Sequence, residues 1–165
     1  MRHTRILALT VPLVVMLAVN VSSIAAQDGP ATAAGEGSDR HPRVLQVVEH
    51  AVSDTVVDVG AAGDSLGDTL AFGNPIFDAG NTHEIGRDQG YCVRTNAGVA
   101  WECNWTVLLD HGSVVVEGPF YDDLRDSQLA ITGGTGAFRG ARGEMTLHAR
   151  DAAGTEFDFI YRISR

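Results

Sequence analysis

Apolar and polar residues alternate along most of the chain after residue 43, and this period is typical of β-strands with one buried face. The alternation is clearest over residues 99–110. One face of that segment carries Val99, Trp101, Cys103, Trp105, Val107 and Leu109. The opposite face carries Glu102, Asn104 and Thr106. We therefore predict a strand that packs its apolar face on a core and turns its polar face to water.

Further segments show strand patterns and are separated by turn-forming residues. They are residues 44–59 with a break near Ser53 and Asp54, 64–78, 84–95, 113–118, 127–132, 142–150 and 155–164. No segment has a convincing helical period. The chain is therefore predicted to be all-β, with about eight antiparallel strands. Such chains close as barrels or pack as sandwiches, and the pattern alone leaves both architectures open.

The N-terminal residues have a different pattern, which is typical of an export signal. Arg2 and Arg5 precede an almost wholly apolar run over 6–21, and small residues follow at 22–26. We interpret residues 1–26 as a secretory signal peptide. The alternative is a membrane anchor, which needs a run of about 20 apolar residues.

Residues 27–42 contain no large apolar side chain, and we interpret them as a flexible linker before a β domain over 43–165. The signal predicts a secreted, extracellular protein without membrane contact after signal removal. The formal net charge of -9 argues against a nucleic-acid partner, because phosphate binding needs clustered Lys and Arg. The six histidines are not spaced as metal ligands, and we expect neither a metal site nor a cofactor.

The two cysteines can face each other across a hairpin centred on Ala97 and Gly98. Facing residues of antiparallel strands have Cβ atoms about 4.5–5.5 Å apart, which is close to the disulfide range. A Cys92–Cys103 disulfide would fit an exported protein. Buried free thiols and, least favoured, a catalytic thiol are the alternatives.

Two longer motifs have counterparts in a known family. The first is FGNPIFD at 72–78 followed by IGRDQGYC at 85–92. The second is VEGPF at 116–120 followed by LAITGGTGAFRGARG at 129–143. In order and spacing they resemble the allene oxide cyclase family, and the glycine-rich stretch is also similar to dirigent proteins. The resemblance implies an eight-stranded antiparallel β-barrel, a homotrimer, and an apolar lumen that holds a small molecule near its reactive geometry.

Several site residues follow from this resemblance. Alternation places Glu49 on the same face as Val47, where an unpaired carboxylate is unfavourable. The resemblance implies that Glu49 projects into the pocket as an acid/base, that Asn74 holds a bound water, and that Phe72 and Cys92 line the lumen. An outward-facing Glu49 or a structural ion pair is the alternative.

We also expect Trp101, Cys103, Trp105 and Phe120 to contact a ligand, because they continue the same interior face. Two positions depart from the cyclase pattern. Phe120 stands where the cyclases have a tyrosine, and Ala51 stands where they have an asparagine. These losses argue against the authentic allene oxide cyclase reaction.

The charged pair Arg87 and Asp88 is expected near a strand end, in an ion pair or a solvated loop. The acidic stretch over 122–126 is expected on a solvated rim. The sequence as a whole predicts an exported barrel that binds an apolar small molecule and steers a cyclisation or isomerisation. A non-catalytic, lipocalin-like binding protein and a barrel with a filled interior are the alternatives, and the residues leave open whether the protein is an enzyme.

Overall fold

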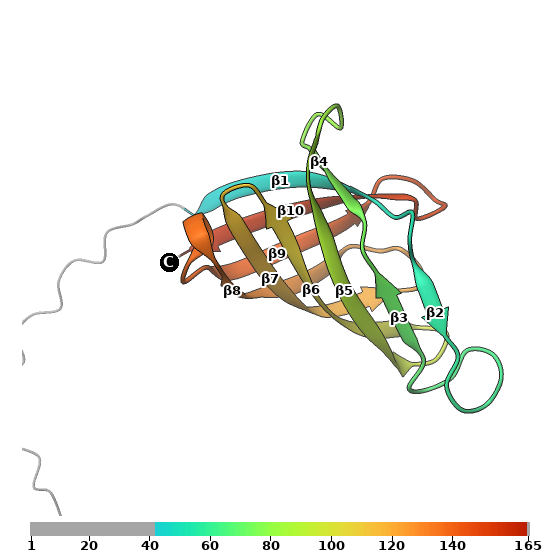
Figure 1. Cartoon of the computed structure of the whole chain (residues 1–165). Helices are drawn as coiled ribbons and strands as arrows, with labels where there is room; N and C mark the ends of the chain where they lie inside the picture. The colour runs from blue at the N-terminus through green and yellow to red at the C-terminus, as the bar shows by residue number, and fades with distance from the viewer. Residues whose placement is uncertain (1–41, 165) are drawn as a thin grey trace, which may run out of the picture. The chain divides into compact units, whose positions relative to one another are not determined.

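The computed structural model describes residues 42–164, which form a 10-stranded sheet and one short 3-10 helix (Figure 1). The elements are β1 (Arg43–His50), β2 (Thr55–Val57), β3 (Thr69–Phe72), β4 (Pro75–Asp78), β5 (Glu84–Asn96), β6 (Ala100–Leu109), β7 (Gly112–Tyr121), β8 (Ser127–Gly134), η1 (Gly136–Phe138), β9 (Arg142–Ala149) and β10 (Glu156–Ser164). No helix over these residues is long enough to cross a membrane. The predicted signal peptide and nearly all of the predicted linker lie outside the described residues.

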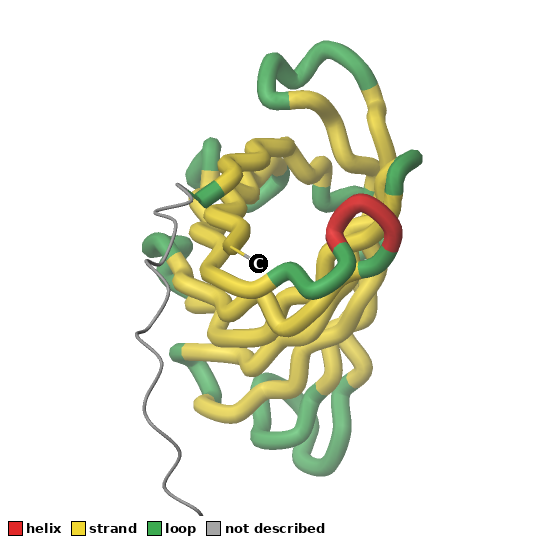
Figure 2. Tube along the Cα trace, turned by 90° about the vertical axis from the view of Figure 1, so that its left-hand side faces the viewer, coloured by secondary structure: helices red, strands yellow, loops and turns green. Residues whose placement is uncertain are grey.

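Antiparallel pairing closes the sheet into a barrel. The strand order is β2-β3-β5-β4-β1-β10-β9-β8-β7-β6, and β5 also pairs with β6. This additional pairing joins the two ends of the sheet, and the strands form a ring in Figure 2. Because β3 and β4 are two halves of one broken barrel strand and β2 pairs only with β3, the barrel has eight strands. The predicted eight-stranded antiparallel barrel is confirmed, and the sandwich alternative is wrong.

The β5–β6 hairpin has the predicted register. Cys92 pairs directly with Cys103, and the two sulfur atoms form a disulfide. Gly98 occupies the turn with a φ of 69°, a conformation that glycine adopts without strain. Gly90 lies opposite Trp105, where an added Cβ would overlap the Cβ of the tryptophan. The two strands can therefore approach closely beside the core.

Alternating side chains from every barrel strand fill the interior. On β6 and β10 the buried residues are Trp101, Cys103, Trp105, Val107, Phe157, Phe159, Tyr161 and Ile163. Val99 differs from the prediction and is 42% exposed. It lies in the hairpin turn, where its N–H donates to the carbonyl of Asn96 instead of entering the β-ladder.

The break between β3 and β4 falls at Gly73 and Asn74, and it positions the functional site. The backbone N–H of Asp88 donates to the carbonyl of Asn74 at 2.9 Å. The backbone N–H of Asn74 donates in turn to the Asp88 side chain at 2.9 Å. A side chain of β5 thus replaces a backbone partner where the ladder is interrupted.

Candidate functional site

The end of the barrel at which β1 ends and β10 begins holds a pocket of about 260 Å³. It is lined by barrel strands and by the loops that follow β1, β7 and β9. The lining residues are Glu49, Asp54, Leu70, Phe72, Cys92, Cys103, Trp105, Phe120, Leu124, Leu147, Ala153, Gly154, Phe157 and Phe159. A cavity of roughly 150 Å³ suffices for benzene, so this pocket has room for a larger ring system.

Packed aromatic rings form a large part of the pocket wall. The ring of Trp105 lies 6.1 Å from that of Phe72 and 5.5 Å from that of Phe159, measured between centroids. On the adjoining wall, the rings of Phe120 and Phe157 meet edge to face at 5.9 Å. These separations are those of attractive aromatic pairs. The wall is therefore apolar and fixed by its own contacts.

Glu49 is the buried acid of this wall, with a relative exposure of 6%. Burial raises its pKa well above the ordinary value, and the nearby charge of Asp88 raises that pKa further. The amide of Asn74 donates to Oε1 of Glu49 at 2.8 Å and opposes this shift. Burial and Asp88 prevail, so the pKa of Glu49 stays above the ordinary value and its protonated form is favoured.

Asp88 corrects the sequence interpretation, which placed it in an ion pair or a solvated loop. Its side chain is fully buried on the inward face of β5, the face that also carries Cys92. The Oδ1 atom of Asp88 accepts the Asn74 N–H at 2.9 Å, while its Oδ2 atom is buried without a hydrogen-bond partner among the described residues, and the Glu49 carboxyl group is close enough for each acid to affect the pKa of the other. Over residues 42–164, no cationic side chain forms an ion pair with it.

Each of these two buried carboxyl groups affects the pKa of the other, so Glu49 and Asp88 act as one titrating unit. Burial also raises the pKa of Asp88, although the neighbouring Glu49 carboxyl group lowers it. The Tyr161 hydroxyl lies nearby and is fully buried; burial and then the Asp88 charge raise its pKa. The arrangement can give a proton to a bound molecule and take one back.

Asn74 lies behind the pocket wall and not on it. Its side-chain oxygen accepts the backbone N–H groups of Val52 and Ser53, each at 3.0 Å. Its side-chain nitrogen donates to Asp54 at 2.9 Å as well as to Glu49. Both amide atoms are thus bonded within the chain, and Asn74 orients the two acids that do line the pocket.

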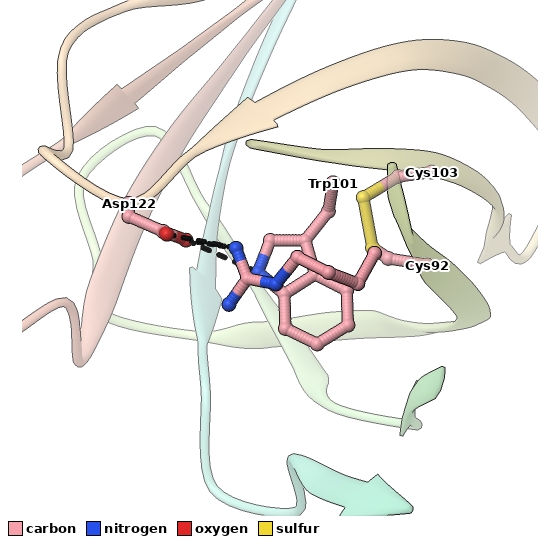
Figure 3. The surroundings of a disulfide bond; sticks show 5 residues. Cys92, Trp101, Cys103 and Asp122 are labelled. Carbon is pink, nitrogen blue, oxygen red and sulfur yellow. Dashed lines mark hydrogen bonds and ion pairs between the residues drawn. A yellow bond between two sulfur atoms is a disulfide. The ribbon is translucent and has the colours of Figure 1, made fainter. Parts of the chain in front are cut away.

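Trp101 also lies outside the pocket lining. Its ring packs under the guanidinium of Arg94 at 3.8 Å, and its indole N–H donates to Asp122 at 3.2 Å. Arg94 forms ion pairs with Asp122 at 2.7 Å and with Asp64 at 2.6 Å. Figure 3 shows Trp101 and Asp122 of this cluster beside the disulfide. The predicted ligand contact at Trp101 is therefore replaced by a structural one.

The comparisons with known proteins agree with this geometry. The family model described as allene oxide cyclase matches residues 38–151. The chain belongs to the allene oxide cyclase family.

Solved structures resemble this allene oxide cyclase family member in fold. Pyocyanin demethylase has a TM-score of 0.63 and 23% identity, covering 72% of this chain and 100% of that chain. A pterocarpan synthase dirigent protein has a TM-score of 0.62 and 17% identity, covering 78% of this chain and 100% of that chain. A Diels Alderase from Streptomyces koyangensis has a TM-score of 0.54 and 13% identity, covering 74% of this chain and 67% of that chain. At these identities the likeness shows a shared barrel.

Most residues that the sequence analysis assigned to the site meet at the pocket of this family member. Its wall includes Glu49, Phe72, Cys92, Cys103, Trp105 and Phe120. Phe120 brings a ring without a hydroxyl group to the wall. The sequence analysis missed Asp54 and Asp88. The signal for Asp88 was present, since period-two alternation gives it the same face as Cys92.

Proposed function

We propose that this allene oxide cyclase family member binds an apolar small molecule in its pocket and steers a cyclisation or isomerisation. The observation that carries the proposal is the buried carboxyl group of Glu49, with a raised pKa, in an otherwise largely apolar wall. Confinement between fixed rings would hold a flexible molecule close to its reactive geometry and lower the entropic part of the barrier.

The proposed chemistry conserves protons. Glu49 donates its proton to an oxygen or nitrogen atom of the substrate as charge develops there. The Glu49–Asp88 unit then takes a proton from another position of the same molecule when the new bond has formed. The product is an isomer of the substrate, and the pair returns to its starting state.

The substrate is expected to differ from that of an authentic allene oxide cyclase. The cyclase pattern has polar groups at the positions of Ala51 and Phe120, and neither side chain here can form a hydrogen bond with a substrate or a water. A purely binding barrel is the alternative function. Two buried acids that titrate together favour catalysis, because an apolar wall alone would bind an apolar molecule without the desolvation cost of carboxyl groups.

Native mass spectrometry of the protein purified from its own source tests the binding step. We expect one apolar molecule per barrel. Leu70→Trp should displace it, because Leu70 lines the pocket. Val93→Trp is the matched control on the neighbouring strand, where the side chain is 36% exposed and not part of the lining. Empty barrels in the unaltered protein, or equal occupancy in both variants, would contradict the proposal.

Glu49→Gln separates catalysis from binding. Glutamine keeps the shape and can still accept from Asn74 and donate to Asp88, but it cannot release a proton. With the molecule recovered from the native protein, we expect affinity to stay within about threefold while conversion falls by at least about a hundredfold. Unchanged conversion would exclude Glu49 as the acid, and a lack of conversion by the unaltered protein would leave the binding function alone.

We further infer that the protein is exported and assembles as a homotrimer. The disulfide supports an oxidising compartment, and residues 1–26 have the pattern of a cleaved signal. The intact mass of protein from the culture medium should correspond to a chain that starts near residue 26 or 27 and carries no free thiols. Native spectra should show three chains. A full-length mass, or a monomer alone, would contradict these inferences.

A further inference from the structure

The pocket contains acids without any balancing cation. Of its lining residues only Glu49 and Asp54 are charged, and none is arginine, lysine or histidine. Directly behind the wall lies Asp88, whose carboxyl group affects the pKa of Glu49. Three carboxyl groups therefore gather at this end of the pocket, and no cationic side chain lines it. A ligand carboxylate placed there would meet like charges and no donor with a positive charge.

The loops at the pocket mouth also carry more acidic than basic residues. The loop after β7 supplies Leu124 to the lining, and the loop after β9 supplies Ala153. These two loops also carry four acids, which are Asp122, Asp123, Asp126 and Asp151.

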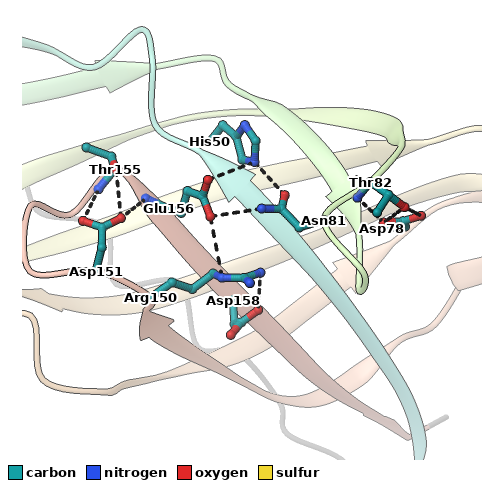
Figure 4. Close-up of polar contacts among 9 residues, drawn as sticks. All are labelled: His50, Asp78, Asn81, Thr82, Arg150, Asp151, Thr155, Glu156 and Asp158. Atoms are coloured by element: carbon teal, nitrogen blue, oxygen red, sulfur yellow. Dashed lines mark hydrogen bonds and ion pairs between the residues drawn. The ribbon is translucent and has the colours of Figure 1, made fainter.

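The arginines of these loops are already occupied. Arg125 forms an ion pair with Asp123 and stacks on the ring of Tyr121 at 3.7 Å. Arg150 forms ion pairs with Glu156 at 3.7 Å and Asp158 at 3.4 Å, as Figure 4 shows. With four aspartates against two arginines, the two loops carry a net negative charge. A mouth with a net negative charge attracts cations and slows the entry of anions.

We propose that the pocket selects aromatic molecules that carry a basic nitrogen or a fixed positive charge, and that it rejects carboxylates such as fatty acids. This inference rests on the proposed function and names the substrate class of the same pocket. A cation beside Glu49 and Asp88 offsets their negative charge. The faces of Trp105 and Phe72 also favour a cation, through the negative face of each ring.

Three probes of one shape and different charge test the inference by isothermal titration calorimetry on the mature, disulfide-bonded protein. They are naphthylmethylamine, which is a cation at neutral pH, naphthalenemethanol, which is neutral, and naphthoate, which is an anion. We expect the cation to bind at least about tenfold more tightly than the anion, with the alcohol between them, because like-charge contacts in a buried site are strongly unfavourable.

Variants locate the origin of the preference. The double variant Glu49→Gln with Asp88→Asn should reduce the ratio of cation to anion affinity at least about tenfold. If this variant does not fold, the same affinity ratio is measured in Asp54→Asn. Asp54 is an exposed acid of the lining, and its loss should also lower the ratio of cation to anion affinity. Asp110→Asn is the control, because Asp110 is an exposed acid at the opposite end of the barrel and outside this lining, and we expect its ratio to stay within about twofold.

The outcomes distinguish the two proposals. Binding of the neutral probe together with equal affinities for cation and anion would overturn this inference and leave the pocket function standing. A ratio that persists in both Asp54→Asn and the double variant would also overturn it. If none of the three probes binds, the proposed pocket function fails and this inference fails with it.

Discussion

Strand β5 places two charged residues, Asp88 and Arg94, on the same inward face, on either side of the disulfide at Cys92. Asp88 is fully buried and Arg94 is 8% exposed. Their surroundings differ completely. Arg94 has carboxylates on both sides and an aromatic ring beneath it. Asp88 has only another carboxyl group and hydrogen-bond donors.

The difference separates a structural charge from a functional one. An ion pair that is complete, like that of Arg94, fixes loops and changes little with pH near neutrality. A pair of acids that titrate together can exchange a proton with a bound molecule, and such perturbed groups beside a pocket are the usual mark of an active site. Strand β5 thus carries a structural ion pair at Arg94 and a titrating acid at Asp88.

The largest effect on stability is expected from loss of the Arg94 ion pairs. Arg94→Met should lower the free energy of unfolding by about 2–3 kcal/mol, because it leaves Asp64 and Asp122 facing each other without a cation. Arg125→Met is the control, since the Arg125–Asp123 pair is exposed and its loss should cost less than about 1 kcal/mol. Urea unfolding at neutral pH measures both, and equal losses would refute the comparison.

The next largest effect on stability is expected from loss of the disulfide, whose Cys92 lies between Asp88 and Arg94 on β5. Replacing Cys92 and Cys103 together by alanine should lower the unfolding free energy by about 2–3 kcal/mol, since the bond closes a short loop in the unfolded chain. The measurement is urea unfolding of the double variant against the oxidised protein. A reduced but otherwise unaltered protein should show a similar loss, and a variant as stable as the parent would contradict the expectation.

Glu49→Gln should change how stability depends on pH. The pKa of Glu49 is raised in the folded protein, so its contribution is complete below the ordinary value of 4.5 and declines as pH rises toward the folded pKa. The glutamine variant lacks this decline. As pH rises above the ordinary value of 4.5, the parent should therefore lose stability relative to the variant. Parallel curves from chemical unfolding above this value would contradict the assignment.

Other acids do not reverse that expectation. The pKa of Asp78 is lowered to about 2, chiefly by the backbone N–H of Thr82. The pKa of Asp68 is lowered by the backbone N–H groups of Val59 and Ser65. Groups with lowered pKa values gain their stabilising effect at lower pH, below the range in which Glu49 titrates.

Among these changes, Asp88→Asn is expected to have the smallest effect on stability. Its effect should appear instead in the titration of Glu49. Removal of the Asp88 charge lowers the pKa of Glu49, while burial keeps that pKa above the ordinary value. Carbon NMR of the labelled Glu49 carboxyl group measures the change. Asp54→Asn should lower the same pKa less, since Asp54 is the last of its causes. A larger change of the Glu49 pKa in Asp54→Asn than in Asp88→Asn would contradict this expectation, because Asp54 would then be the main charge that raises that pKa.

The fold could be predicted because its determinants are local. Alternation located every barrel strand, and the spacing of Cys92 and Cys103 around Gly98 gave the register of one hairpin. Barrel closure could not be read from the period, since a sandwich has the same alternation. It depended on the motifs over 72–78 and 129–143.

The site could be predicted only in part, because burial of a charge depends on what lies across the barrel. Glu49 was found on an apolar face by alternation. Asp88 has the same alternation signal, but a carboxylate is ordinarily solvated, and only the tertiary contact with Glu49 makes its burial tolerable. Asn74 and Trp101 were predicted at the ligand and instead lie behind the wall, where each holds a carboxylate.

At the break between β3 and β4, the same contacts complete the barrel and position the acids of the site. At Asn74 the ladder is completed by side chains, since Asp88 accepts its N–H and its own amide oxygen accepts the N–H groups of Val52 and Ser53. A mutation that restored a continuous strand there would remove the groups that hold Glu49. Hairpin loops outside the pocket lining can vary without touching this arrangement, whereas a residue inserted or deleted at Gly73 would disrupt the contacts that position the two acids.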